Sequence, residues 1–492
     1  MRKPALLFFT SCIFTGVFAK SILFEHGTII SFGEENQQLE VIRNGSLLIT
    51  DDRVAGIFPS SGNNATAIPP DTERISADGD IITPASSTLI DIPGRLLTYL
   101  VHWANTTLTS EVYDRETMYY SELMGLCEGL NSGVTTIVDY ATGSITEEAT
   151  RAGVAAMADS GVRGTFGFPM SSAHSNFTLE DQMALWQELA TQQESARSLV
   201  SMGLVYETFD IGAPEEIQAI IDFARTSNIS LLGTHFVGGP IGTANSPTLL
   251  ASLSLLNSTF PITFVHGNGL TPTDAVLLRT HNHYVAHAPV FEAHHGSNFR
   301  ALAHAADQAS LSAGSPASQS PDLLGEMRAW LQQVRTAAYE DAIADRWRVP
   351  ANNPASVRQA FLLATRAGGL ALRRPELGVL RVGAKADVVV FDGTAPGVLG
   401  WADAVAAVVM HAGVGDIKHV LVDGEWRKRD GELRCGGEGW QVVRARFLQA
   451  AQRLQAFFEG VPRPELEGGW FGGMELERLE EVDALRGPGK GY

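Results

Sequence analysis

Several side chains that can transfer protons or bind metal ions follow short apolar runs in this chain. His235 comes directly after LLGT, and His266 comes directly after ITFV. A third segment, HAPVFEAHHG, supplies four more candidates: His287, Glu292, His294 and His295. Imidazoles exchange protons near neutral pH and are common metal ligands, and a carboxylate can act as a general acid or base. The alternative for each residue is a structural core histidine or a solvated loop side chain.

The elements that must position these residues are predicted to form a barrel. Between residues 85 and 370, apolar runs alternate with helical segments, and their starts lie roughly 20 to 40 residues apart, a repeat typical of strand-loop-helix units. Eight strands are predicted, at residues 88–92, 134–138, 162–166, 199–205, 230–234, 262–265, 284–288 and 309–313. In such a barrel the functional side chains lie at the carboxyl ends of the strands, which is where His235 and His266 stand.

The segments on either side of the barrel carry short alternating strands and turn residues. Asn44-Gly45 and Asp52-Arg53 before the barrel, and Asp423-Gly424 and Asp430-Gly431 after it, are predicted turns. We therefore expect the two ends of the chain to pair into one small β domain. The predicted division is residues 1–19 as a signal peptide, 20–84 with 371–435 as the β domain, 85–370 as the barrel, and 436–492 as a helical extension and tail.

The first 19 residues, MRKPALLFFTSCIFTGVFA, combine a basic start, an apolar run and small residues before the expected cleavage site. This pattern predicts a secretory signal peptide, since the apolar run is shorter than the ~20 residues that span a membrane. The alternative is a membrane anchor. Six N-x-S/T sequons support secretion as a glycoprotein or residence in the secretory lumen; they begin at Asn44, Asn64, Asn105, Asn176, Asn228 and Asn257.

Charge and cysteine content exclude several kinds of partner and site. Asp and Glu number 55 against 36 Lys and Arg, a net charge of -19, so a phosphate backbone would be repelled. We expect a small-molecule substrate, no nucleic acid and no stable membrane insertion, with a homodimer as the commonest assembly of soluble enzymes. Without Cys12 only Cys127 and Cys435 remain, far apart in sequence, and neither a disulfide framework nor a cysteine-rich zinc site is predicted.

Longer motifs along the chain add a family resemblance. They include EGLNSGVTTIVD at 128–139, GTHFVGGP at 233–240, FVHGNGLT at 264–271, ADQASLSAGS at 306–315 and ELGVLRVGAKADVVVFDG at 376–393. In this order they resemble the metal-dependent amidohydrolase superfamily, in particular the branch with cytosine and guanine deaminases and triazine chlorohydrolases. The resemblance spans nearly the whole mature chain. It implies an α/β fold in which a (β/α)8 TIM-type barrel carries a small composite β-sandwich formed by the N- and C-terminal strands.

The resemblance also implies a divalent ion, zinc or iron, that turns bound water into a nucleophile. His235, after the fifth strand, matches a metal-ligand position. His266, after the sixth, matches a histidine that touches the water or a second metal, so it is a candidate for both metal binding and catalysis. Glu292 matches a Pro-x-x-Glu feature of this branch and is the candidate general acid or base.

Three expected ligands differ from the family pattern. Where the family has I-D-x-H-x-H, this chain has Pro93 and Arg95, whose nitrogens cannot coordinate a cation, and Gly314 stands at the aspartate position of the eighth strand. Either the metal is lost, or it is rebuilt from the His287 to His295 segment, or the coding sequence across residues 84–105 is misread. Arg95, His294 and His295 are then candidates for substrate binding.

Three hypotheses for function follow. The first is an amidohydrolase-type hydrolase that acts on a carbon-nitrogen bond of a small organic molecule, by deamination or amide cleavage. The second is a metal-independent dehydratase, isomerase or cyclase of a biosynthetic pathway that uses His235, His266 and Glu292 as acid and base. The third is a non-catalytic binding protein, because a fold alone does not decide function.

Overall fold

The structure is a computed structural model that describes residues 20–60, 68–90, 114–173, 176–237, 244–294, 299–315, 319–437, 439–459, 469–470 and 474–475. The predicted signal peptide, Pro93, Arg95 and His295 lie outside these residues. The described part therefore tests the barrel, most of the β domain and the two histidines that follow the fifth and sixth strands.

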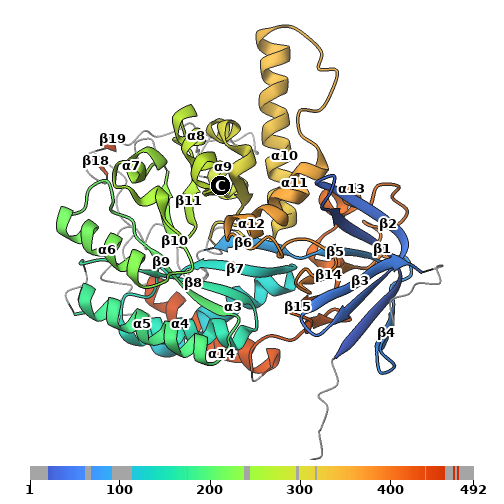
Figure 1. Ribbon diagram of the computed structural model, residues 1–492, viewed down its shortest axis with the longest axis horizontal. Helices are drawn as coiled ribbons and strands as arrows, with labels where there is room; N and C mark the ends of the chain where they lie inside the picture. Colours follow the sequence, from blue (N-terminus) through green and yellow to red (C-terminus); the bar gives the residue numbers. More distant parts are fainter. Residues whose placement is uncertain are drawn as a thin grey trace, which may run out of the picture.

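Eight parallel strands form one curled sheet in the order β13-β12-β11-β10-β9-β8-β7-β6 (Figure 1). The strands are β6 (Ser86–Ile90), β7 (Val134–Tyr140), β8 (Arg163–Pro169), β9 (Val200–Val205), β10 (Leu232–Phe236), β11 (Ile262–His266), β12 (Tyr284–His287) and β13 (Ala309–Leu311). Residues of β6 and β13, at the two ends of this order, approach one another. The barrel prediction is confirmed, and each of the eight predicted strands has its counterpart.

Helices connect successive strands and cover the outside of this sheet (Figure 1). The main helices are α3 (Arg115–Asn131), α4 (Glu147–Ser160), α5 (Leu179–Ser195), α6 (Pro214–Thr226), α8 (Pro272–His281), α10 (Leu323–Glu340), α11 (Val357–Ala364) and α14 (Trp440–Glu459). Shorter helices are α7 (Pro247–Ser252), α9 (Pro289–His294), α12 (Arg366–Ala371) and α13 (Ala404–Ala406). Helices cover the outside of the sheet, and side chains from the other strands fill its inside, so β7 is buried along its whole length.

The N- and C-terminal segments pair into a second sheet, of nine strands, in the order β17-β16-β15-β14-β5-β1-β2-β3, with β4 on β1. The strands are β1 (Ser21–Gly33), β2 (Gln38–Thr50), β3 (Arg53–Pro59), β4 (Glu73–Ser76), β5 (Ile81–Pro84), β14 (Val388–Phe391), β15 (Ile417–Val422), β16 (Glu425–Arg429) and β17 (Glu432–Leu433). β14 pairs antiparallel with β5, which joins the two ends of the chain. The composite β domain is confirmed, whereas its predicted boundaries stay a prediction.

One predicted turn in this domain is wrong. Asn44 and Gly45 lie inside β2, not between two strands. The register between β1 and β2 shifts around Gly27, and Asn44 takes a φ of 48°, so the left-handed conformation serves a bulge within a continuous strand. By contrast, the left-handed Asp423-Gly424 and Asp430-Gly431 pairs form the predicted hairpin turns.

A buried arginine links the barrel to the β domain. Arg163, the first residue of β8, donates through Nε and Nη2 to the carboxylate of Asp387 at 3.1 Å for both bonds. Its Nη2 also lies 2.6 Å from Oδ1 of Asp423, in the turn between β15 and β16. The Arg163 and Asp387 side chains are 7% and 4% exposed. Because both charges are almost out of water, each depends on the other for compensation.

The structure contains a disulfide that the sequence analysis did not predict. Cys127 in α3 and Cys435, five residues before α14, are joined across a sequence separation of 308 residues, with Cα atoms 5.6 Å apart. Neither cysteine is close to the other in sequence, and only the packing of α14 against α3 brings them together (Figure 1). Among the described helices, none combines the length and apolar composition that crossing a bilayer requires.

Replacing Arg163 tests whether its buried ion pair with Asp387 stabilises the contact between the barrel and the β domain. We expect Arg163→Ala to lower the free energy of unfolding by about 3–5 kcal/mol, because it leaves the buried Asp387 carboxylate without its cation. Denaturant titration followed by fluorescence measures the change. As a matched control, Arg151→Ala removes an exposed arginine paired with Glu188 and should cost less than about 1 kcal/mol. Equal effects of the two substitutions would contradict the role of burial.

Candidate active site

His235 is held at the carboxyl end of β10 by a carboxylate. Its Nδ1 lies 2.8 Å from Oε1 of Glu207, and its backbone N–H donates to Oε2 of the same residue at 2.9 Å. An ionised carboxylate only accepts hydrogen bonds, so this contact places the ring proton on Nδ1 and the lone pair of the neutral ring on Nε2. The His235 side chain is 30% exposed, so solvent reaches it.

His266, the last residue of β11, has a similar partner. Its Nδ1 lies 3.3 Å from Oε1 of Glu292 in α9, and the backbone N–H of Ala288 donates to that oxygen at 3.1 Å. The imidazole stacks on the ring of Phe291, with centroids 5.2 Å apart and planes inclined by 13°. A φ of 73° turns the backbone at His266 just as the strand ends. Phe291 on one face and Glu292 at Nδ1 therefore fix the orientation of the His266 ring.

The two imidazoles lie next to each other. Their centroids are 5.5 Å apart. The parallel register of β10 and β11 places Val265 opposite His235 and Phe236 opposite His266, so regular alternation would point the two rings to opposite faces, and the φ of 73° at His266 turns its ring toward His235. Each ring has a carboxylate at its Nδ1. The result is two imidazole-carboxylate pairs, His235–Glu207 and His266–Glu292, at the same end of the barrel.

Glu292 also contacts a second histidine. Its Oε2 lies 2.8 Å from Nδ1 of His287, the last residue of β12, although the approach does not meet hydrogen-bond geometry. Burial alone would raise the pKa of Glu292, but His287 and His266 together hold that pKa at about 2. Burial lowers the pKa of His266, against the opposing effect of Glu292. At neutral pH this centre therefore contains an ionised carboxylate beside a neutral imidazole.

Tyr140 completes the wall behind His235. Its ring meets the His235 imidazole edge to face, with centroids 5.0 Å apart. Burial raises the pKa of Tyr140, so its phenol stays neutral. A Cβ at Gly233 would lie 2.2 Å from the phenol oxygen of Tyr140, so only glycine fits opposite this ring. Gly233 thus allows Tyr140 to reach His235.

Gly314, at the position where the resemblance implies an aspartate, has a backbone that disfavours any side chain. Its φ is +62°, and a Cβ there would lie 2.8 Å from Cβ of Phe291 and 3.0 Å from its ring. The same Phe291 stacks on His266. The space that a ligand aspartate would need is therefore taken by the residue that supports the histidine.

The structure brings together some of the predicted site residues and leaves others apart. His235, His266, Glu292 and His287 form one connected group. His294 ends α9 and is exposed. Arg95 and His295 lie outside the described residues, so their predicted role in substrate binding stays a prediction.

Sequence reasoning missed Glu207, Tyr140 and Phe291. Glu207 stands two residues after the end of β9, a barrel position from which a side chain reaches the next strand. That position was the available signal, because a polar residue just after a buried strand is a candidate for the functional end of a barrel. Tyr140 ends β7 and Phe291 lies within α9, and both resemble ordinary core aromatics in sequence.

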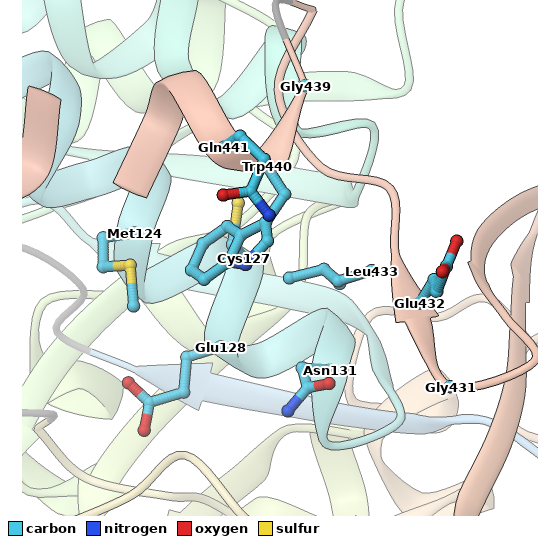
Figure 2. Close-up of a pocket in the computed structure, with 10 residues that line it drawn as sticks. All are labelled: Met124, Cys127, Glu128, Asn131, Gly431, Glu432, Leu433, Gly439, Trp440 and Gln441. Atoms are coloured by element: carbon cyan, nitrogen blue, oxygen red, sulfur yellow. The ribbon is translucent and has the colours of Figure 1, made fainter. Parts of the chain in front are cut away.

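A cavity of about 860 Å³ lies elsewhere, beside the disulfide (Figure 2). Residues of α3, the β16–β17 hairpin and the start of α14 line it, including Glu128, Asn131, Glu432 and Trp440. Asn131 ends α3 three residues before β7 begins, so this cavity faces the amino ends of the strands. His235 and His266 stand at the opposite ends, where barrel enzymes place their chemistry.

Comparison with known proteins identifies the family. Residues 95–427, more than half of the chain, match the Amidohydrolase family. The chain belongs to this family. No curated protein matches it.

Solved structures show the same fold at low sequence identity. An adenosine deaminase from Xanthomonas campestris with bound zinc is 17% identical, with a TM-score of 0.72, covering 89% of this chain and 99% of that one. Atrazine chlorohydrolase TrzN from Arthrobacter aurescens TC1, complexed with zinc, is 16% identical, with a TM-score of 0.70 and coverage of 87% and 100%. An amidohydrolase from an environmental sample of the Sargasso Sea is 18% identical, with a TM-score of 0.67 and coverage of 89% and 100%.

Among the described residues, the donors of this amidohydrolase do not fit the zinc that the first two of these structures contain. Within the described residues, no group of three or more His, Cys, Asp or Glu side chains is placed to hold a metal ion. Glu207 and Glu292 are bound at the Nδ1 atoms of His235 and His266, on the far side of each ring from Nε2. Catalytic zinc sites keep about three protein ligands, whereas here two imidazoles are adjacent.

Gly314→Ala tests the local reason for the missing aspartate. We expect a loss of about 1–3 kcal/mol in the free energy of unfolding, because alanine disfavours a φ of +62° and its Cβ would press on Phe291. Gly325→Ala is the control: it lies in α10, where a Cβ meets only Oδ2 of Asp322 at 3.6 Å, so stability should change by less than about 1 kcal/mol. Denaturant titration of both variants decides; a neutral Gly314→Ala would refute the crowding.

Proposed function

We propose that this chain hydrolyses a carbon-nitrogen bond of a small organic molecule, by deamination or amide cleavage, at the His235–Glu207 and His266–Glu292 pairs. Membership of the amidohydrolase family supports hydrolysis of carbon-nitrogen bonds in small molecules by an enzyme of this type. The observation that carries the assignment to this site is the pair of imidazoles 5.5 Å apart, each held through Nδ1 by a carboxylate.

His235 is the residue that we assign as the base. Glu207 keeps the ring proton of His235 on Nδ1. Nε2 of His235 therefore accepts a proton from a water molecule while the water oxygen attacks the substrate carbon. Glu207 also stabilises the imidazolium that forms. The same Nε2–H then protonates the departing nitrogen, which returns His235 to its neutral state.

His266 is assigned to bind the substrate at the reacting group. It is buried and stacked on Phe291, and Glu292 holds its Nδ1, so its ring keeps one orientation. Glu292 in turn accepts a hydrogen bond from the backbone N–H of Ala288, and its Oε2 lies 2.8 Å from Nδ1 of His287. We expect the loops at the carboxyl end of the barrel to determine which substrate is bound. The homodimer stays a prediction.

Activity measurements test the assignment. A panel of amino-substituted heterocycles and small amides is incubated with the protein, and released ammonia or amine is measured. We expect His235→Ala to lower kcat by about 10²- to 10⁴-fold, since a positioned base contributes that much. Glu207→Gln should lower kcat by about 10-fold or more, because the imidazolium loses its negative partner.

Two controls separate this effect from general damage. His411→Ala removes an exposed imidazole stacked on Trp401, and Glu188→Gln removes an exposed carboxylate paired with Arg151. Both should keep full activity. Full activity in His235→Ala, or the absence of any carbon-nitrogen cleavage by the wild-type chain across the panel, would count against the proposed function.

We also propose that the protein is a secreted or secretory-pathway glycoprotein. The buried Cys127–Cys435 disulfide supports folding in an oxidising compartment. Four sequon asparagines lie within the described residues, and all four are exposed: Asn44, Asn176, Asn228 and Asn257. Exposure is what the glycosylation machinery requires of an acceptor.

Expression of the full chain in a secreting eukaryotic cell tests the compartment. We expect protein in the medium that migrates faster after treatment with a glycosidase that removes N-glycans, with a disulfide-linked Cys127–Cys435 peptide pair in mass spectra taken without reduction. Asn228→Gln with Asn257→Gln should remove part of the mobility shift. Retention inside the cell with both thiols reduced would contradict the proposal.

A further inference from the structure

We propose that His235 and His266 work without a metal ion, and that the His235–Glu207 pair takes over the ion's role in activating water while His266, held by Glu292, binds the substrate. This inference rests on the proposed function for its chemistry, but its central claim concerns metal binding and can be measured without any substrate. It departs from the zinc-containing structures that share the fold.

The backbone that follows the eighth strand disfavours an aspartate at position 314. A ligand aspartate at position 314 would need a φ other than +62° and a Phe291 displaced from its present place. Displacing Phe291 would also remove the aromatic ring that stacks on His266. An aspartate at position 314 would therefore be strained itself and would also disturb the orientation of His266. The backbone at this position favours glycine.

The residues at the other two expected ligand positions lack atoms that can donate to a metal ion. Pro93 has no nitrogen lone pair available for coordination, and the guanidinium of Arg95 stays protonated at any physiological pH. These two substitutions and Gly314 lie more than 200 residues apart in the chain. Two separate segments of the chain, around Pro93 and around Gly314, therefore lack the expected donors.

The carboxylates of Glu207 and Glu292 are engaged with the histidines themselves. Glu207 and Glu292 each bind the Nδ1 side of a histidine, so they orient the rings and do not share the space that the Nε2 atoms face. Among the described residues no third donor joins these two imidazoles, whereas a catalytic zinc site has about three protein ligands. What the arrangement does supply is two oriented imidazoles, each beside a carboxylate.

The proposed step balances without a metal. Water gives one proton to Nε2 of His235, its oxygen forms a bond to the substrate carbon, and the carbon-nitrogen bond breaks with its electron pair staying on nitrogen. The nitrogen takes the proton back from Nε2 and leaves as an amine or ammonia. The net reaction adds one water across the bond and needs no oxidant or reductant.

A substrate class follows from the energetics. A bound zinc ion lowers the pKa of water to about 7 and polarises the substrate, whereas a positioned base supplies only about 10²- to 10⁴-fold. The substrate must make up part of the difference, so we infer that its carbon is already electron-poor, as in an acyl group or ring that carries electron-withdrawing substituents.

Metal content is the deciding experiment. The full secreted chain is incubated with zinc, iron or manganese, desalted, and analysed by mass spectrometry of the elements, beside a His235→Ala/His266→Ala variant. We expect the two proteins to hold the same amount of metal, with a difference below about 0.1 ion per chain. Zinc should also shift the melting temperature of the two proteins equally.

Two results would overturn the inference. One is a stoichiometric ion in the wild-type chain that the double variant lacks. The other is a melting temperature that zinc raises only in the wild-type chain, since a ligand that binds the native site stabilises it. Metal that both proteins hold equally lies outside this centre and leaves the inference intact.

The substrate class has its own probe. Trifluoroacetanilide has an electron-poor acyl carbon and acetanilide does not, and both contain the same leaving group. We expect release of aniline from the first in the presence of chelator, lost in His235→Ala, and none from the second. Equal cleavage of the two anilides would overturn the substrate class. Cleavage of neither would count against the proposed function, while the metal measurement would still stand.

Discussion

The parallel pairing of β10 with β11, together with the left-handed backbone of His266, is the constraint on which the candidate site depends. It sets His235 and His266 side by side at the carboxyl end of the sheet, and their carboxylate partners come from the loop after β9 and from α9. In this register His235 lies opposite Val265 and His266 opposite Phe236, so alternation alone would point the two side chains to opposite faces, and the φ of 73° at His266 turns its ring toward His235. The site therefore depends on strand register and on one left-handed residue, and each carboxylate then fixes the orientation of its histidine.

Two glycines leave space for aromatic rings that pack beside the histidines. Gly233 leaves room for Tyr140 against His235, and Gly314 leaves room for Phe291 against His266. In each case an aromatic ring occupies the space of a missing side chain and braces one imidazole. At the eighth strand, the glycine at the expected aspartate position is thus matched by the packing of Phe291.

Elements far from the site hold the barrel in place. Arg163 joins β8 to the β domain through Asp387 and Asp423, and the Cys127–Cys435 disulfide ties the segment before α14 to α3. Both links connect parts of the chain that are more than 200 residues apart. They meet the barrel on the side of the strand beginnings, since Arg163 starts β8 and Cys127 lies near the end of α3. The candidate active site lies at the opposite end, where the strands finish.

The sequence by itself determined the architecture and the identity of the histidines. Apolar runs at regular spacing were enough for eight strands, because each buried strand and its covering helix are local patterns, and the imidazoles after the fifth and sixth runs could be read in place. Only the tertiary structure decided the partners. Glu207, Phe291 and the disulfide arise from contacts between distant segments, which no local pattern encodes, and the Asn44-Gly45 pair served a bulge because its neighbour strand set the register. Which donors meet at one point depends on packing across the sheet, and that is a property of the folded chain alone.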